Sequence, residues 1–226
     1  SLKNVDAVIH LAAIVGDAAC NKQPQLAVET NFLATKNLVQ LCASNKIDKL
    51  IFASTASVYG VKNVICDEYT PPEPFSLYSI TKLNAEYEVL KTTDGIIFRM
   101  GTLYGLSPKM RYDLVVNEFI RRAKKEGKIT VFGGNQIRPF LHIDDASDTY
   151  VKALDKLQIA GIFNLSNENL SIKQLAEIIA QETGCKIECL PEIVDKSNYQ
   201  MTCEKAKHHL GFNPKKSIKD AIKEIE

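Results

Sequence analysis

Short apolar runs alternate with longer segments of helical periodicity over the first half of this chain. The apolar runs lie at 5–13, 49–53 and 95–100, and helical spacing of apolar residues marks 24–45 and 77–91. Strands that are joined through helices of ten or more residues typically pair in parallel, with helices on both faces of the sheet. We therefore predict an α/β fold with a doubly wound parallel sheet.

The second half of the chain is less regular. We expect one domain at 1–110 that holds most of the sheet, and a small α/β lobe at 111–226 from which some segments return to the sheet. The three prolines at 71, 72 and 74 predict a loop over 61–76. The further elements that we expect are helices at 113–126, 145–156, 172–182 and 217–225, and strands at 129–132, 138–143, 161–165 and 186–190.

Composition excludes some classes of function. The 226 residues carry a net charge of +1, so no overall field attracts nucleic acid or an anionic membrane. We find no apolar run long enough to cross a bilayer and no signal peptide, and the six cysteines are scattered, which favours a reduced cytoplasmic protein. A conceivable zinc site would have as its ligands Cys185, Cys189, Cys203, His208 and His209. This site is disfavoured because no C-x-x-C pair occurs, and we expect no metal.

A tyrosine and a lysine lie one helical turn apart in Tyr78-Ser-Ile-Thr-Lys82. A free tyrosine is a poor base at neutral pH, because its pKa is about 10. An ammonium group nearby favours the phenolate and lowers that pKa, so Tyr78 becomes a candidate acid/base. Taken alone, this spacing is common by chance, and an ordinary surface helix is then the favoured interpretation.

A hydroxyl side chain strengthens the catalytic interpretation. Thr55 ends a predicted strand 23 residues before Tyr78, and ligand-binding groups of open parallel sheets gather at such strand ends. Thr55 could bind the substrate oxygen that exchanges a proton with Tyr78. The alternative is a turn in which the hydroxyl satisfies only its own backbone. The order of strand, hydroxyl turn, proline-rich loop and Y-x-x-x-K helix favours the catalytic interpretation.

Several motifs in this order resemble the extended short-chain dehydrogenase/reductase superfamily, in its NAD-dependent epimerase/dehydratase branch. They are HLAA at 10–13, TNFLATKNL at 30–38, FASTASVYG at 52–60, YSITK at 78–82, RMGTLYG at 99–105 and RPFLHIDD at 138–145. The resemblance covers nearly the whole chain. It implies a Rossmann-like sheet and a nucleotide-sugar substrate.

The resemblance also assigns roles to single residues. The catalytic residues would be Thr55, Tyr78 and Lys82. The cofactor, NAD with NADP not excluded, would contact Leu11, Ala12, Ala13, Thr30, Tyr78, Lys82 and Gly101. The nucleotide sugar would contact Thr55, Thr102, Asn117, Val131, Phe132 and Arg138, with Arg138 on the diphosphate. Asn31 matches a position that ties neighbouring loops. The helices 24–45 and 77–91 would pair two subunits in a homodimer.

The chain departs from the family pattern in two places. The family's G-x-x-G-x-x-G loop does not occur among the eleven glycines, and roughly 60–70 residues of the family pattern are missing. We expect that the chain is a fragment or that a second chain supplies this part, and that this chain alone binds the cofactor weakly. The sugar dehydratases of the family carry an Asp-Glu pair where this chain has Ala56 and Ser57. We therefore predict an epimerase, at C4 of the sugar. A nucleotide-keto-sugar reductase or dehydrogenase, or a non-catalytic nucleotide-sugar-binding subunit, remains as an alternative.

Overall fold

The main sheet has four parallel strands in the order β1-β2-β4-β8. The computed structural model describes residues 2–47, 49–156, 158–191 and 197–225. The strands are β1 (Ala7–His10), β2 (Lys49–Thr55), β4 (Ile96–Met100) and β8 (Gly161–Leu165). The predicted doubly wound sheet is confirmed, and β8 is a segment of the second half that returns to it.

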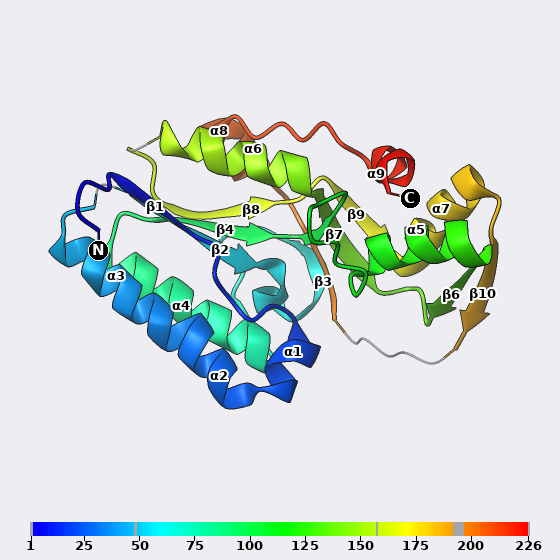
Figure 1. The fold of residues 1–226 in the computed structure, drawn as a ribbon, viewed down its shortest axis with the longest axis horizontal. Helices are drawn as coiled ribbons and strands as arrows, with labels where there is room; N and C mark the ends of the chain where they lie inside the picture. The colour runs from blue at the N-terminus through cyan, green and yellow to red at the C-terminus, as the bar shows by residue number, and fades with distance from the viewer. Residues whose placement is uncertain (1, 48, 157, 192–196, 226) are drawn as a thin grey trace.

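Helices cover both faces of this sheet (Figure 1). One face carries α1 (Asp17–Lys22), α2 (Pro24–Val28), the π-helical turn η1 (Glu29–Leu33), α3 (Ala34–Ser44) and α4 (Leu77–Thr92). The other face carries α6 (Ile143–Leu154) and α8 (Glu204–Leu210). Because successive strand residues point to opposite faces, Ile51 packs with Phe98 on the α6 side, whereas Phe52 packs with Val39 on the α3 side.

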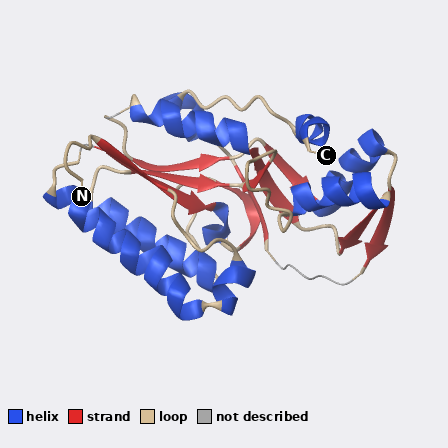
Figure 2. Ribbon diagram, viewed as in Figure 1, coloured by secondary structure: helices blue, strands red, loops and turns tan. Residues whose placement is uncertain are grey.

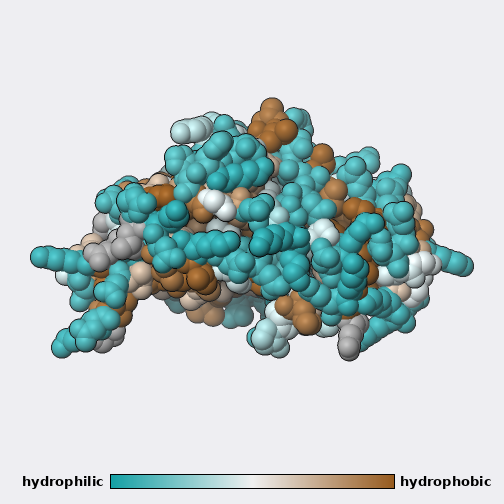
Figure 3. Space-filling view, turned by 90° about the horizontal axis from the view of Figure 1, so that it is seen from above, coloured by the Kyte–Doolittle hydropathy of each residue, from teal (hydrophilic) through white to brown (hydrophobic). Residues whose placement is uncertain are grey.

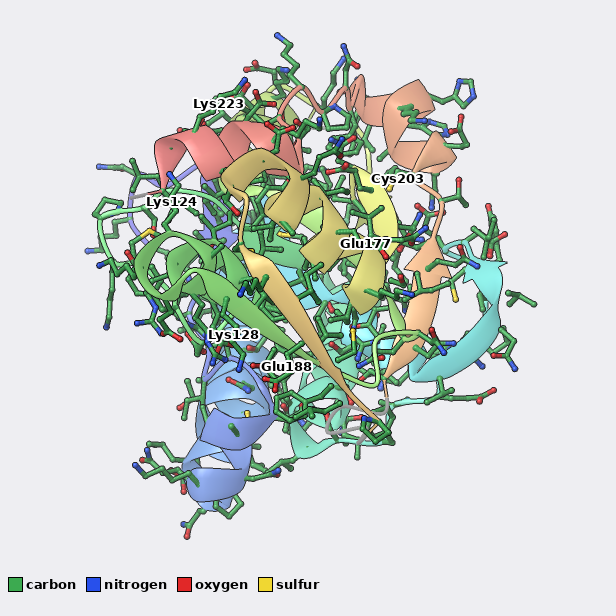
Figure 4. The ribbon with its side chains drawn as sticks, turned by 90° about the vertical axis from the view of Figure 1, so that its right-hand side faces the viewer. Lys124, Lys128, Glu177, Glu188, Cys203 and Lys223 are labelled. Atoms are coloured by element: carbon green, nitrogen blue, oxygen red, sulfur yellow. The ribbon has the colours of Figure 1, made fainter. Side chains whose placement is uncertain are left out.

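A second group of elements surrounds its own apolar core (Figure 2). These elements are α5 (Val115–Glu126), β6 (Lys128–Phe132), α7 (Ile172–Thr183), β10 (Lys186–Leu190) and α9 (Ile218–Glu224). Strands β6 and β10 pair in parallel, and Lys128 forms a 2.6 Å ion pair with Glu188 across them (Figure 4). Between this lobe and the main sheet lie β5 (Thr102–Tyr104), β7 (Ile137–His142) and β9 (Glu168–Ser171), which form a three-stranded sheet.

One predicted loop is partly a strand. Residues 61–76 were expected to be irregular, but β3 (Val61–Cys66) pairs in parallel with β11 (Asn198–Met201). All three prolines follow β3 in the chain, so they do not interrupt its hydrogen bonds. The partner strand lies more than 130 residues away in the sequence, which local pattern cannot reveal. Strand β3 follows the short helix η2 (Ala56–Tyr59), and this connection places β11 beside the end of β2.

No helix among the described residues is both long and apolar enough to cross a membrane.

Candidate active site

Helix α4 places Tyr78 and Lys82 on one face near its N-terminus. Ser76 caps the helix, because its hydroxyl accepts a hydrogen bond from the Ser79 N–H, and Ser79 returns the contact to the backbone of Ser76. This capping box fixes where the helix begins. Tyr78 therefore lies in the first turn and Lys82 one turn later, as the sequence predicts.

Thr55 is the last residue of β2, and its hydroxyl contacts the Tyr78 phenol through a hydrogen bond. The same hydroxyl accepts a hydrogen bond from the Ser57 N–H at 3.2 Å. Thr55 thus forms both the predicted contact with Tyr78 and the local hydroxyl turn that was the alternative. The turn orients the Thr55 side chain, and its hydroxyl can still form a hydrogen bond with Tyr78.

The pKa of Tyr78 corrects one expectation. The spacing of Tyr78 and Lys82 predicts a lowered pKa, but burial raises the pKa of the phenol because the phenolate would lose its hydration. The hydrogen bond with Thr55 acts in the opposite direction and is the smaller effect. Burial thus favours the phenol over the phenolate, so Tyr78 needs a nearby positive charge to act as a base.

Lys82 is a buried cation one helical turn after Tyr78. Its side chain is 3% exposed, and its Nζ lies 4.1 Å from the centroid of the Phe52 ring. Burial lowers the pKa of Lys82 to about 8, and the negative charge of Glu86 opposes this effect. Within the described part of the chain, the ammonium group has no hydrogen-bonding partner. Its three donors are thus available to hydroxyl groups such as those of a ribose.

A buried ion pair lies behind Lys82. Glu86, one turn further along α4, accepts hydrogen bonds from Arg99 at 2.7 and 3.1 Å and from the Ser54 hydroxyl. Both charged side chains are at most 3% exposed. A pair so well bonded holds its geometry firmly. It anchors α4 to β2 and β4, the two strands whose ends border the site.

The segment that follows β1 is exposed although it is apolar. Leu11 is 59% exposed, and Ala12 and Ala13 follow it with small side chains. Asn31 holds this segment in place, because its side chain forms hydrogen bonds with both the N–H and the carbonyl of Ile14, at 2.7 and 2.9 Å. Asn31 thus ties neighbouring loops, as expected. An exposed apolar segment beside a buried ammonium fits the face of a dinucleotide such as NAD.

Gly101 has a structural reason of its own. A Cβ atom at this position would lie 2.7 Å from the carbonyl oxygen of Pro139, so only glycine allows the connection between β4 and β5 to approach β7 this closely. Thr30 lies half-buried in η1. For both residues, contact with the cofactor stays a prediction.

The residues predicted for the substrate differ in their surroundings. Arg138 is 5% exposed, with its guanidinium carbon 5.4 Å from the centroid of the Tyr199 ring. Asn117 holds the loop at 105–111, bonding Gly105 at 3.1 Å and the Arg111 carbonyl at 3.2 Å. Val131 belongs to the core of the second lobe. The neighbouring Phe132 and the more distant Thr102 are half-buried.

Sequence reasoning missed two hydroxyl residues at the site. The Ser57 hydroxyl lies 3.1 Å from the Thr55 hydroxyl and 3.1 Å from the phenol oxygen of Tyr199. Tyr199 comes from β11 and is 6% exposed. Nothing in the sequence near Tyr199 signals this position. Glu86, in contrast, could have been found, because it continues the stripe of Tyr78 and Lys82 at the same spacing.

A separate polar cluster joins β7 to the C-terminal helix. Among the described residues, His142, Asp144 and Glu224 are the one group close enough together to hold a metal ion. The His142 Nε2 atom lies 3.1 Å from Glu224, and the Lys216 ammonium contacts both carboxylates. Lys216 thus already supplies the positive charge that the two carboxylates require.

Comparisons with known proteins agree with this geometry. The model of a family described as the NAD dependent epimerase/dehydratase family matches residues 1–166. Over 232 residues the chain is 33% identical to a UDP-glucuronate 4-epimerase of Thermodesulfobacterium geofontis, covering 97% of this chain and 71% of that protein. It is 32% identical to an uncharacterized UDP-glucose epimerase of Bacillus subtilis, covering 98% of this chain and 73% of the relative.

Solved structures give the same result. The UDP-glucuronic acid 4-epimerase of Bacillus cereus, in complex with UDP-glucuronic acid and NAD, superposes with a TM-score of 0.88 at 31% identity. The superposition covers 99% of this chain and 75% of that one.

Proposed function

Because this chain belongs to the NAD-dependent epimerase/dehydratase family, we propose that it is an NAD-dependent epimerase that acts at C4 of a nucleotide-activated sugar. The observation that carries the proposal is the contact of Tyr78 with Thr55, with Lys82 one helical turn away. The similarity to UDP-sugar 4-epimerases supports the substrate class. In this proposal residues 1–110 bind mainly the cofactor and residues 111–226 bind mainly the sugar nucleotide.

The three proposed catalytic residues, Thr55, Tyr78 and Lys82 (the trio), each have a distinct task in the mechanism. When bound, NAD supplies a reversible hydride acceptor and a positively charged ring at the edge of the sheet. The phenolate oxygen of Tyr78 accepts the proton of the sugar hydroxyl. It returns this proton after the keto-sugar has rotated to present its opposite face. Thr55 orients that sugar oxygen. Burial disfavours the phenolate of Tyr78. In this proposal Lys82 binds the ribose hydroxyls, and its positive charge, one helical turn away, favours the phenolate.

The residues after Thr55 support epimerisation rather than dehydration. Elimination of water from the sugar needs an additional acid and base. Ala56 is 1% exposed and has no ionisable group, and the Ser57 hydroxyl is held by Thr55 and Tyr199. Epimerisation needs a hydride and a proton to be removed, the keto-sugar to rotate, and both to be returned. NAD would carry the hydride and Tyr78 the proton, so no further acid or base is required.

The test is a direct search for the product. The purified protein is incubated with NAD and a panel of UDP-, dTDP- and GDP-sugars, and the products are resolved by NMR. We expect a C4 epimer of at least one sugar with no net formation of NADH. Tyr78→Phe should lower the rate by about 10²–10⁴-fold, because it removes the acid/base while it keeps the ring. Stoichiometric oxidation or reduction of NAD would indicate a dehydrogenase or reductase, and binding without turnover a non-catalytic subunit.

We also propose that the protein is a homodimer paired through α2, α3 and α4, and that it resides in the cytoplasm. Apolar side chains are exposed along one face of the α2–α3 segment and one face of α4, and α3 contacts α4. They are Leu26, Leu33, Leu41, Ile80, Tyr87 and Leu90, each between 41% and 54% exposed. The face above α6 and α8 is, in contrast, mainly hydrophilic (Figure 3). All six cysteines are free, which suits a reducing compartment.

A further inference from the structure

A row of hydroxyl groups extends from Tyr78 into the C-terminal half of the chain. The Thr55 hydroxyl contacts Tyr78, Ser57 lies 3.1 Å from Thr55, and the phenol oxygen of Tyr199 lies 3.1 Å from Ser57. Thr55 lies in β2, Ser57 in η2 and Tyr199 in β11. Because β11 pairs with β3, Tyr199 lies within hydrogen-bonding distance of Ser57, two residues after Thr55.

We propose that Tyr199 is a positioning residue for the reaction, and that its hydroxyl group, acting through Ser57 and Thr55, stabilises the form of Tyr78 that accepts the substrate proton. The inference rests on the proposed function, in which Tyr78 is the acid/base.

The physical basis is the direction in which the hydroxyl groups donate. While Tyr78 is protonated, the Thr55 hydroxyl donates to Ser57. A Tyr78 phenolate needs donors, so Thr55 must turn its hydrogen toward Tyr78 and then accept one from Ser57. For this, Ser57 must accept a hydrogen bond from the phenol of Tyr199, whose oxygen lies 3.1 Å from the Ser57 hydroxyl, a contact in which either group can donate. Hydrogen bonds in such a row strengthen one another, so removing the Tyr199 hydroxyl weakens the stabilisation of a Tyr78 phenolate.

Tyr199 also connects this row to the predicted diphosphate-binding residue. The Arg138 guanidinium lies over the Tyr199 ring, at 5.4 Å from its centroid. This contact uses the ring and not the hydroxyl, so the two roles of Tyr199 can be separated by a Tyr199→Phe substitution, which keeps the ring.

The surroundings of Tyr78 contain other ionisable groups that any pH measurement must consider. They are Lys82 on the same helix, Asp17 and Cys20 on α1, Arg111 in the loop before α5, and Tyr150 on α6. Tyr199→Phe keeps all of them. The charge of Tyr199 itself acts directly to raise the pKa of Tyr78, so its loss would lower that pKa, and only an acid limb that moves to higher pH reports the hydroxyl row.

The experiment compares Tyr199→Phe with Tyr69→Phe, a matched control at a tyrosine that is 84% exposed. We expect Tyr199→Phe to lower kcat by about 10-fold, a part of the 10²–10⁴ that acid/base catalysis contributes, with KM changed less than about 3-fold. The acid limb of the kcat profile should move to higher pH. Unchanged kcat and an unchanged profile in Tyr199→Phe would overturn the proposal.

A double-mutant cycle tests whether the effect passes through Ser57. Ser57→Ala should resemble Tyr199→Phe, and the double variant should lose little more than the larger single loss, because both break the same row. Losses that multiply would show that Tyr199 does not act through Ser57.

A measurement without substrate separates this inference from the proposed function. In the protein labelled with carbon-13 at the tyrosine Cζ, Tyr78→Phe identifies the Tyr78 signal. That signal should move in Tyr199→Phe and Ser57→Ala and stay in place in Tyr69→Phe. A signal that stays in place in all three overturns the inference, even if the protein is an epimerase. If the signal moves but no sugar is converted, the proposed function fails and the hydroxyl row stands.

Discussion

At the scale of single residues, the charge of Lys82 depends on pH near neutrality. Burial lowers its pKa to about 8, with the charge of Glu86 acting against this effect. The lysine is thus protonated below about pH 8 and loses its charge above it. The neighbouring His10 adds no second charge near neutrality, because burial and the charge of Lys82 lower its pKa to about 4.

We therefore expect epimerisation to decline as the pH rises through about 8, because neutral Lys82 no longer favours the phenolate. The measurement is kcat/KM between acidic and alkaline pH. Lys82→Arg keeps a permanent positive charge, so its residual activity should lack this alkaline limb, whereas Lys82→Met should be inactive throughout. An alkaline limb that persists unchanged in Lys82→Arg would assign it to another group.

The relative positions of Thr55, Tyr78 and Lys82 could be predicted from the sequence better than their electrostatics, whereas their catalytic roles stay a prediction. Tyr78 and Lys82 could be found because both belong to one helix, whose periodicity fixes their relative position. The raised pKa of Tyr78 could not be predicted, since it depends on how deeply neighbouring elements bury the phenol. Tyr199 could not be found for a similar reason, because its position follows from a pairing across 142 residues from Ser57.

At the scale of elements, the parallel strands and long helices were predictable, because each carries its own apolar pattern. Strand β8 lies at Gly161–Leu165 and β10 at Lys186–Leu190, as predicted. Strands β3 and β11 were not predicted. Val61, Val64 and Ile65 of β3 are all largely exposed, so its sequence lacks the alternation that a half-buried strand shows.

The turn between η2 and β3 leads to a prediction about stability. Gly60 has a φ of 76°, and a Cβ atom there would lie 2.1 Å from the carbonyl oxygen of Glu73. This contact closes the loop that leads to Tyr78, so Gly60→Ala must displace it. We expect a loss of roughly 3–4 kcal/mol in the free energy of unfolding, measured in urea, together with lower activity.

Gly127 provides the matched control. Its φ is 65°, but nothing lies within 4 Å of the position of a Cβ atom. Gly127→Ala therefore costs only the backbone strain of a left-handed residue, about 1–2 kcal/mol. Equal losses in the two variants would mean that contact with Glu73 is unimportant.

At the scale of the whole molecule, the site depends on both halves of the chain. Thr55, Tyr78 and Lys82 come from the first half, whereas Arg138 and Tyr199 come from the second. The short parallel pair of β3 and β11 joins them. The division near residue 110 into a cofactor region and a sugar region is a proposal about function. It does not separate them as independent folding units, because β8 completes the main sheet.

The proposed dimer gives the last prediction. Leu41 on α3 is 54% exposed and Tyr87 on α4 is 46% exposed, on neighbouring helices that contact each other. An apolar surface of this kind, formed by two adjacent helices, suits a symmetric interface with the same pair from a second copy. Two charges placed there would have to be buried without partners on each side of the interface, which is strongly unfavourable.

We expect the protein to show about twice the mass of one chain by light scattering, and the double variant Leu41→Glu/Tyr87→Glu to show the mass of a single chain. The matched control is Val151→Glu, at a side chain of α6 that is 63% exposed on the opposite face of the sheet. The control should remain a dimer. Because both substituted side chains are exposed in the single chain, the separated subunits should keep their fold by circular dichroism. A monomeric parent protein, or a double variant with the mass of the parent, would rule out pairing through these helices.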